Sequence, residues 1–264
     1  MKPIITVDEA RALPDMRLLD ARAQGYREGH LEGALQADLE VDLSTPADPA
    51  LGGRHPLPAL SDWTATVGRW GIDPDTPVVI YDDRGGVLAA ARAWWMFRAI
   101  GHTKVAVLEG GMQAALDAGW PTSMKVPQVE HQAPYPAERW LLPTIDAEGV
   151  HAARSDAAWT LVDVRAPERY EGRVEPIDPV AGHIAGAINL PCADNLDADG
   201  TFKSAEALRG MFADLDPEHT IVSCGSGVTA CHTLLAMDLA GLPIPSLYVG
   251  SWSEWCRKGW PSSP

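Results

Sequence analysis

Short apolar runs alternate along the chain with longer segments of helical periodicity. The short runs have the length and β-branched content of buried strands, and they cover residues 78–81, 105–108, 220–223 and 246–249. Two longer segments, residues 87–100 and 228–240, are apolar nearly all round, and the glycines that follow them, Gly101 and Gly241, are suited to end helices. Because strands and helices follow one another in turn, we predict an α/β fold with mostly parallel sheets flanked by helices.

The chain also contains an internal repeat. Residues 18–22 (Leu-Leu-Asp-Ala-Arg) resemble residues 161–165 (Leu-Val-Asp-Val-Arg), and the apolar run before Asp82 resembles the run before Cys224. The two copies lie about 140 residues apart, and the second carries an insertion of about ten residues within 171–180. A single repeat of this length indicates two duplicated domains and not a solenoid.

Proline content predicts where one domain ends and the next begins. Five prolines lie between residues 121 and 143, a density that is typical of an extended connector. We therefore expect an N-terminal domain over residues 1–124, a proline-rich linker over residues 125–140 and a C-terminal domain over residues 141–264. Two domains of this size agree with the usual length of a globular domain.

The charge balance excludes some classes of partner. The chain has 36 acidic and 21 basic residues and a net charge of −15 at pH 7. Binding to a nucleic-acid backbone or an anionic membrane surface requires an excess of lysine and arginine, so we expect no nucleic acid and no membrane as partners. A small anion can still bind in a local positive pocket, because net charge constrains surfaces more than sites.

The cysteines and the start of the chain bear on its location. Four cysteines are too sparse for a disulfide scaffold, and none forms a Cys-x-x-Cys pair that would suggest zinc. The first residues lack the apolar run of a secretory signal, and no run of 18 apolar residues predicts a membrane helix. We therefore expect free thiols in a cytoplasmic protein.

Cys224 occupies the position best suited to chemistry. It follows the predicted strand 220–223 and opens the turn Cys-Gly-Ser-Gly-Val-Thr-Ala, residues 224–230, which leads into a predicted helix. Open α/β folds bind ligands at the carboxyl ends of their strands, and the glycines let backbone N–H groups turn inward at the positive end of the helix. A thiol held there should lose its proton more easily and act as a nucleophile.

The same loop argues against two phosphate chemistries. A cysteine-based phosphatase needs an arginine six residues after its cysteine, where this chain has Ala230. A Walker-type loop needs a lysine followed by serine or threonine, and residues 224–230 contain no lysine. For Cys224 taken alone, a buried structural cysteine at a strand end is the alternative.

With this loop, the chain resembles the tandem rhodanese-type sulfurtransferases, the family of the 3-mercaptopyruvate and thiosulfate sulfurtransferases. Further similar segments run through nearly the whole chain, at residues 81–82, 91–98, 101–102, 108–111, 182–184 and 248–255. The resemblance implies two rhodanese-like domains, of which the first is catalytically silent because Asp82 stands in the nucleophile's place. It implies a persulfide carried on Cys224 in the second domain, and no metal or organic cofactor.

The resemblance also assigns the residues around the nucleophile. Ser226 is expected to be catalytic together with Cys224 and His55, and the other residues that follow Cys224 in the loop would bind the donor: Gly225, Gly227, Val228 and Thr229. Their backbone N–H groups would stabilise the negative charge of the persulfide. Arg169 matches an arginine that binds the substrate carboxylate, for which a forked guanidinium is suited. The family often has a second such arginine, and Arg173 is the nearest candidate in this chain.

Two further positions are implied with alternatives left open. His55 matches a histidine that pairs with the loop serine, here Ser226, and the acidic partner of that histidine falls at Glu40, where the family has aspartate. The sequence leaves open whether Glu40, His55 and Ser226 form a complete relay. Cys231 is interpreted as a small buried residue, with a resolving thiol as the alternative.

These observations predict a sulfurtransferase that takes sulfur from 3-mercaptopyruvate and passes it from Cys224 to a thiol, cyanide or a thioredoxin-like protein. Thiosulfate is the alternative donor. Relatives that prefer thiosulfate tend to carry basic residues directly after the cysteine, and the neutral Gly225 and Ser226 favour the mercapto-keto acid. A non-catalytic sulfur-carrier or regulatory module is a third interpretation, against which the intact loop and Arg169 argue.

Overall fold

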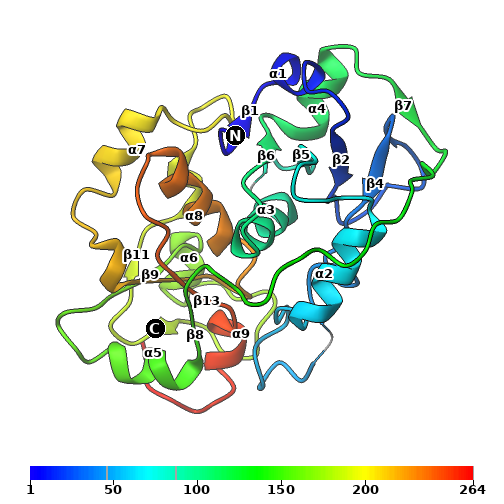
Figure 1. The fold of residues 1–264 in the computed structure, drawn as a ribbon. Helices are drawn as coiled ribbons and strands as arrows, with labels where there is room; N and C mark the ends of the chain where they lie inside the picture. The colour runs from blue at the N-terminus through cyan, green and yellow to red at the C-terminus, as the bar shows by residue number, and fades with distance from the viewer. Residues whose placement is uncertain (46, 87, 264) are drawn as a thin grey trace. The chain divides into compact units, whose positions relative to one another are not determined.

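The chain folds into two compact units, and Figure 1 labels most of their helices and strands. The computed structural model describes residues 1–45, 47–86 and 88–263. Unit 1 is formed by residues 1–45 and 58–142, and unit 2 by residues 46–57 and 143–264.

Unit 1 is built on a parallel sheet of five strands in the order β1-β6-β5-β2-β4. The strands are β1 (Ile4–Ile5), β2 (Arg17–Asp20), β4 (Ala34–Gln36), β5 (Val78–Tyr81) and β6 (Val105–Leu108). The helices are α1 (Val7–Arg11), α2 (Leu60–Arg69), α3 (Ala89–Ala99) and α4 (Gly111–Asp117). A short antiparallel pair completes the unit: β3 (His30–Leu31) and β7 (Thr122–Ser123).

Unit 2 repeats this sheet, in the order β8-β13-β12-β9-β11. The strands are β8 (Thr144–Ile145), β9 (Thr160–Asp163), β11 (Ile188–Asn189), β12 (Thr220–Ser223) and β13 (Ser246–Tyr248). The helices are α5 (Ala147–Ala153), α6 (Pro167–Tyr170), α7 (Ala205–Met211), α8 (Ala230–Leu239) and α9 (Ser251–Trp255). The 3₁₀ turns are η1 (Cys192–Asn195) and η2 (Pro217–His219), and β10 (His183–Ile184) pairs antiparallel with β14 (Ser262–Ser263). The shared strand order confirms the predicted α/β duplication.

Three central strands have the predicted bounds because both of their faces are buried. β5, β6 and β12 match the predicted runs, and every residue in them is buried. A strand that is buried on both faces needs apolar side chains in succession, so its sequence is a continuous run instead of an alternation. β13 ends one residue before its predicted end, because Tyr248, which pairs with Ile145 of β8, is its last paired residue.

The two long apolar helices end where the following glycines predict, and one begins later than predicted. Gly101 and Gly241 follow α3 and α8 with φ of +82° and +74°, the left-handed conformation that commonly ends a helix. The helix predicted over 228–240 begins at Ala230, because Val228 and Thr229 still belong to the preceding loop. The predicted start of α3 at residue 87 lies outside the described residues.

The compact units divide the chain differently from the predicted domains in two places. Within residues 125–140, predicted as a linker, the backbone N–H groups of Gln132 and Tyr135 donate to the carbonyls of Gly68 (2.8 Å) and Thr64 (3.0 Å), so this segment packs on α2 of unit 1. Residues 47–57, which we call the strap, belong to unit 2 although the first domain surrounds them in the sequence. Chain order alone therefore does not define the units.

Two buried histidines are expected to make the fold sensitive to acid. His102 in unit 1 and His232 in unit 2 are 1% and 0% exposed, and burial lowers the pKa of His102 to about 4 and the pKa of His232 to about 3. An unfolded histidine titrates near pH 6.5, so the stability that these neutral rings contribute is present above that pH and is lost as the pH falls toward 4 and 3.

We expect each ring to make the free energy of unfolding fall by up to about 1.4 kcal/mol per pH unit below pH 6.5. Urea denaturation at a series of pH values measures this slope. His102→Gln and His232→Gln should each reduce it, whereas His131→Gln, at an exposed position, should leave it unchanged. Equal slopes in all four proteins would contradict the assignment.

Candidate active site

The loop of residues 224–229 follows the central strand β12, at the carboxyl end of the sheet of unit 2. Cys224 at its start is only 1% exposed. The Cys224 backbone N–H donates to Ser251 Oγ (3.1 Å), and its carbonyl accepts from the Trp252 N–H (3.0 Å). The turn between β13 and α9 therefore fixes the position of the predicted nucleophile.

Holding Cys224 in this position places Ser251 in a strained backbone conformation. Its φ of +52° is left-handed, a conformation that is uncommon for residues other than glycine. Its hydroxyl compensates, because Oγ donates to the Tyr248 carbonyl (2.8 Å) and accepts from Cys224. Strained residues of this kind concentrate at functional sites.

The middle of the loop requires Gly227 and leaves several backbone donors open. Gly227 has φ of +73°, and a Cβ at this residue would lie 2.3 Å from the Val249 carbonyl oxygen. In the part of the chain that the structure describes, the backbone N–H groups of Ser226, Val228 and Thr229 donate to no protein acceptor. The loop thus presents unsatisfied donors next to the sulfur, as expected of an anion site.

In unit 1 the equivalent loop encloses a carboxylate of its own. Asp82, at the position equivalent to Cys224, is 1% exposed and accepts four backbone N–H groups. They belong to Arg84 (2.9 Å), Gly86 (2.8 Å), Leu88 (3.2 Å) and Ala90 (3.3 Å). Burial raises the pKa of Asp82, and these N–H groups oppose that effect. This loop conformation therefore gathers N–H donors around a negative group at the strand end.

Arg169 reaches the Cys224 loop from α6. Its Nε and Nη2 donate to Glu175, with the shortest distance 2.7 Å to Oε1, and its Nη1 lies 3.3 Å from the point where a Cβ of Gly225 would be. Burial would raise the pKa of Glu175, but the Asp178 backbone N–H and the Arg169 guanidinium outweigh it and hold this pKa below its ordinary value. A charged carboxylate thus orients Arg169 toward the loop.

The strap brings a second arginine to the same place. The Arg54 backbone N–H donates to Ser253 Oγ (3.0 Å), and its Nη1 donates to Asp178, whose side chain is fully buried. Its Nη2 lies 3.3 Å from the same Cβ point of Gly225. No motif in the sequence points to Arg54, Glu175 or Asp178. The signal available for the two acids is the insertion in the second copy, which contains them.

His55 also comes from the strap and meets its predicted partner. His55 Nδ1 and Ser226 Oγ are 2.8 Å apart, within hydrogen-bond distance. Glu40 is exposed and belongs to unit 1. The pairing of histidine with serine is present within unit 2, and a relay that includes Glu40 stays a prediction.

Arg173 does not approach the loop in the way that Arg169 does. Its side chain is 60% exposed and forms an ion pair with Glu171. No contact with Gly225 or with the rest of the Cys224 loop is found for it among the described residues. Its role as a second substrate arginine stays a prediction, and the guanidinium that lies beside Arg169 at Gly225 is that of Arg54.

The other three thiols have different surroundings. All four cysteines are free, as predicted. Burial raises the pKa of Cys192 to about 11 and also raises the pKa of Cys256, so both are mostly protonated near neutral pH. Cys231 is buried and donates through Sγ to the Gly227 carbonyl (3.4 Å). This contact fits the interpretation of Cys231 as a small buried residue that supports the loop.

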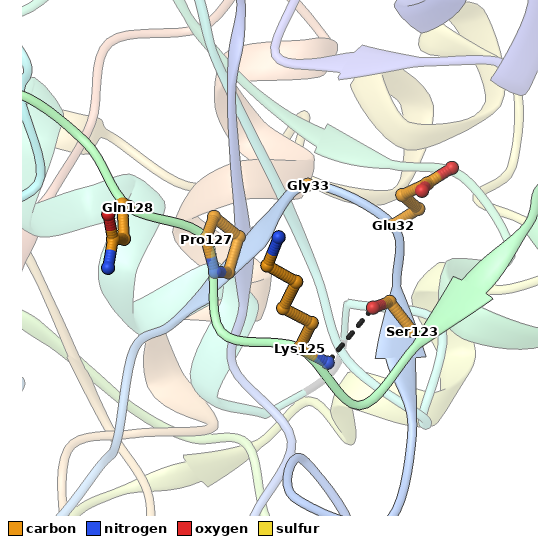
Figure 2. Close-up of a pocket in the computed structure, with 6 residues that line it drawn as sticks. All are labelled: Glu32, Gly33, Ser123, Lys125, Pro127 and Gln128. Carbon is orange, nitrogen blue, oxygen red and sulfur yellow. Dashed lines mark hydrogen bonds between the residues drawn. The ribbon is translucent and has the colours of Figure 1, made fainter.

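A hollow in unit 1 has different chemistry. Figure 2 shows this hollow of about 470 Å³, where the backbone N–H of Lys125 donates to Ser123 Oγ (2.9 Å). Its lining is Glu32, Gly33, Ser123, Lys125, Pro127 and Gln128. Most of these residues are exposed, and none is a nucleophile held against a base. Within residues 1–45, 47–86 and 88–263, no group of three histidines, cysteines or acids is placed to bind a metal ion.

Comparison with known proteins bears on both halves of the chain. The model of the rhodanese-like domain matches residues 6–118 and 146–258. A protein of Pseudomonas aeruginosa described as "Probable 3-mercaptopyruvate sulfurtransferase" is 41% identical over 261 residues, which cover 92% of this chain and 89% of the relative. The thiosulfate sulfurtransferase of Mus musculus is 40% identical over 214 residues, which cover 78% of this chain and 72% of the relative.

A solved structure gives the same result for the fold. SseA from Escherichia coli, described as a 3-mercaptopyruvate sulfotransferase, superposes with a TM-score of 0.80 and 28% identity. The superposition covers 96% of this chain and 99% of SseA. The similarity therefore extends over both units, as the resemblance had implied.

Proposed function

The chain belongs to the rhodanese-like family, with two such domains in tandem, and from this membership we propose that it transfers sulfur from 3-mercaptopyruvate through a persulfide on Cys224. The observation that carries the choice of donor is the environment of Gly225. Two neutral residues, Gly225 and Ser226, follow the cysteine, and guanidinium nitrogens approach Gly225 from one side. A donor with one carboxylate and a neutral thiol suits such a site better than a small dianion.

In the first half-reaction the Cys224 thiolate attacks the thiol sulfur of 3-mercaptopyruvate. An S–S bond forms while the C–S bond of the donor breaks, and the electron pair of that bond leaves on the enolate of pyruvate. The thiol proton of the donor is delivered to the enolate carbon, for which the Ser226 and His55 pair is the nearest proton relay. Pyruvate leaves, and Cys224 keeps the outer sulfur as a persulfide anion.

The open N–H groups of the loop stabilise that anion. The equivalent loop of unit 1 supports this role, because it already surrounds the Asp82 carboxylate with four backbone donors. In the second half-reaction an acceptor thiolate or cyanide attacks the outer sulfur. The S–S bond breaks, and its electron pair returns to Cys224 as the thiolate.

We also propose an acceptor for the sulfur and a location for the protein. A thiol, cyanide or a thioredoxin-like protein is proposed as acceptor, since each presents a nucleophile to the outer sulfur. Four free cysteines favour a reducing compartment such as the cytoplasm. Among the residues described, no helix is long and apolar enough to cross a membrane.

Thiosulfate is the second candidate donor, because the mouse relative carries that name. The test is kcat/KM for 3-mercaptopyruvate and for thiosulfate, measured on one preparation, together with the mass of the protein after incubation with each donor. We expect kcat/KM to be at least about tenfold higher for 3-mercaptopyruvate and the mass to rise by about 32 Da, one sulfur atom. A higher value for thiosulfate would replace the donor, and no mass gain with either would indicate a non-catalytic module.

A further inference from the structure

We propose that Arg54 of the strap is a specificity-determining residue, which together with Arg169 forms a clamp of two guanidiniums for the carboxylate of the sulfur donor. This proposal rests on the proposed function. It assigns the second substrate arginine to a residue that lies far from the first in the sequence, 115 positions away.

The first observation is that two unpaired nitrogens converge on one point. Arg169 Nη1 and Arg54 Nη2 each lie 3.3 Å from the position that a Cβ of Gly225 would occupy, one residue after Cys224. Among the described residues, neither nitrogen donates a hydrogen bond to a protein acceptor. Guanidinium donors left open on the same side of a nucleophile are suited to bind a carboxylate between them.

The second observation is that buried acids hold the opposite edge of each guanidinium. Arg169 uses Nε and Nη2 for Glu175, and Arg54 uses Nη1 for Asp178. The side chains of Glu175 and Asp178 are 3% and 0% exposed. Glu175 is itself fixed by the backbone N–H groups of Ile177 and Asp178, both at 3.0 Å. Both arginines are therefore oriented before a ligand arrives, which reduces the entropy lost on binding.

The third observation is the charge of the cluster. Arg165 and Arg257 also contact these acids, through Glu175 (3.4 Å) and Asp178 (3.0 Å). The cluster contains four guanidiniums and three carboxylates, whose members are Arg54, Arg165, Arg169, Arg257, Asp163, Glu175 and Asp178. The cluster therefore carries one more positive than negative charge, which matches a donor with a single carboxylate.

The clamp also accounts for Gly225. Its φ does not require glycine, since it is not among the residues with positive φ. A Cβ there would instead occupy the space that both arginines face, at contact distances that leave no room for a ligand oxygen. Glycine at this position keeps the binding space open.

The insertion of the second copy explains why only unit 2 has this clamp. Glu175 and Asp178 lie within residues 171–180, which have no counterpart in unit 1. The equivalent arginine of unit 1, Arg22, which corresponds to Arg165, pairs with Asp20 alone among described acids. The insertion supplies the acids, and the strap supplies the second arginine.

The test compares Arg54→Ala, Arg54→Lys, Arg169→Ala and Gly225→Ala with the full-length wild type. We expect Arg54→Ala and Arg169→Ala each to raise KM for 3-mercaptopyruvate by roughly 10- to 150-fold with a much smaller change in kcat, as for loss of a charged hydrogen bond. Arg54→Lys should recover only part of the loss, because ammonium lacks the fork. Gly225→Ala should raise KM without removing any charge.

Arg209→Ala is the matched control in unit 2, because its guanidinium donates to the Ala240 carbonyl and lies outside the cluster. Its KM should change less than about threefold. Pyruvate inhibition provides a readout independent of turnover: its inhibition constant should rise in Arg54→Ala in step with KM. Persulfide formation from inorganic polysulfide, which has no carboxylate, should be unchanged in Arg54→Ala and shows that the variant folds.

The outcomes separate the clamp from the proposed function. If the wild type turns over 3-mercaptopyruvate and Arg54→Ala keeps the wild-type KM and pyruvate inhibition, the clamp is wrong and the donor assignment stands. If Arg54→Ala loses polysulfide reactivity as well, the role of Arg54 is structural and the clamp is also overturned. If the wild type does not use 3-mercaptopyruvate, the proposed function fails first.

Discussion

Cys224→Ser should abolish sulfur transfer, with a loss in kcat of at least about 10³-fold, because a serine hydroxyl neither forms the persulfide nor returns as a stable leaving group. The substitution removes only the sulfur, since the loop geometry depends on backbone bonds from Cys224 to Ser251 and Trp252. The variant should therefore fold normally and still bind pyruvate. Steady-state turnover and intact mass after exposure to 3-mercaptopyruvate measure the two effects.

Matched controls exist in the same chain. Cys192→Ser and Cys256→Ser change thiols whose pKa is raised by burial, and both variants should keep most of the activity and gain one sulfur per chain. Turnover by Cys224→Ser within tenfold of the wild type would mean that another group carries the sulfur. If the wild type gains two sulfur atoms and Cys192→Ser gains only one, Cys192 carries a persulfide as well.

Asp82→Ala should destabilise unit 1 by about 3 kcal/mol or more, because four backbone N–H groups lose their shared acceptor. Some of these donors are only partly buried and regain water, which limits the loss. Urea denaturation gives the free energy of unfolding. Formate should restore part of it in Asp82→Ala and have little effect on the wild type, because a small carboxylate then binds only the variant's empty loop.

The neighbouring acid provides the control for this substitution. Asp83 is exposed, so Asp83→Ala should change the free energy of unfolding by less than about 0.5 kcal/mol. Equal stability of Asp82→Ala and Asp83→Ala would show that the loop of unit 1 does not depend on its carboxylate. It would also weaken the argument that the Cys224 loop stabilises an anion.

The sequence was sufficient to locate the predicted nucleophile. Cys224 follows a strand that is buried throughout. Such strands are easily predicted from the sequence, because their apolar run is continuous. A glycine in the loop is also explained by local structure. Gly227 has a positive φ and approaches Val249 so closely that a side chain is not tolerated. His55 was found through family resemblance, and its contact with Ser226 agrees with that assignment.

The start of α8 shows where local patterns stop being informative. Val228 is apolar and buried, so it continues the helical pattern, yet its backbone belongs to the loop. The periodicity of side chains reports which face is buried, and it does not report where backbone hydrogen bonding begins. Helix starts are therefore less certain than the existence of the helix.

By itself, the sequence determined the duplication, the α/β class, the central strands and the Cys224 loop. Each of these depends on short continuous segments of sequence, which in the duplication occur twice. The tertiary structure alone decided that the strap packs in unit 2 and that Arg54 meets Asp178 across 124 positions. Such a pair leaves no periodicity or local motif, because either residue read alone is an ordinary polar side chain in a loop. The fully buried Asp178 is paired with both Arg54 and Arg257, since a buried carboxylate needs positive partners. The pairing with Arg54 is the one that places a second guanidinium beside Gly225.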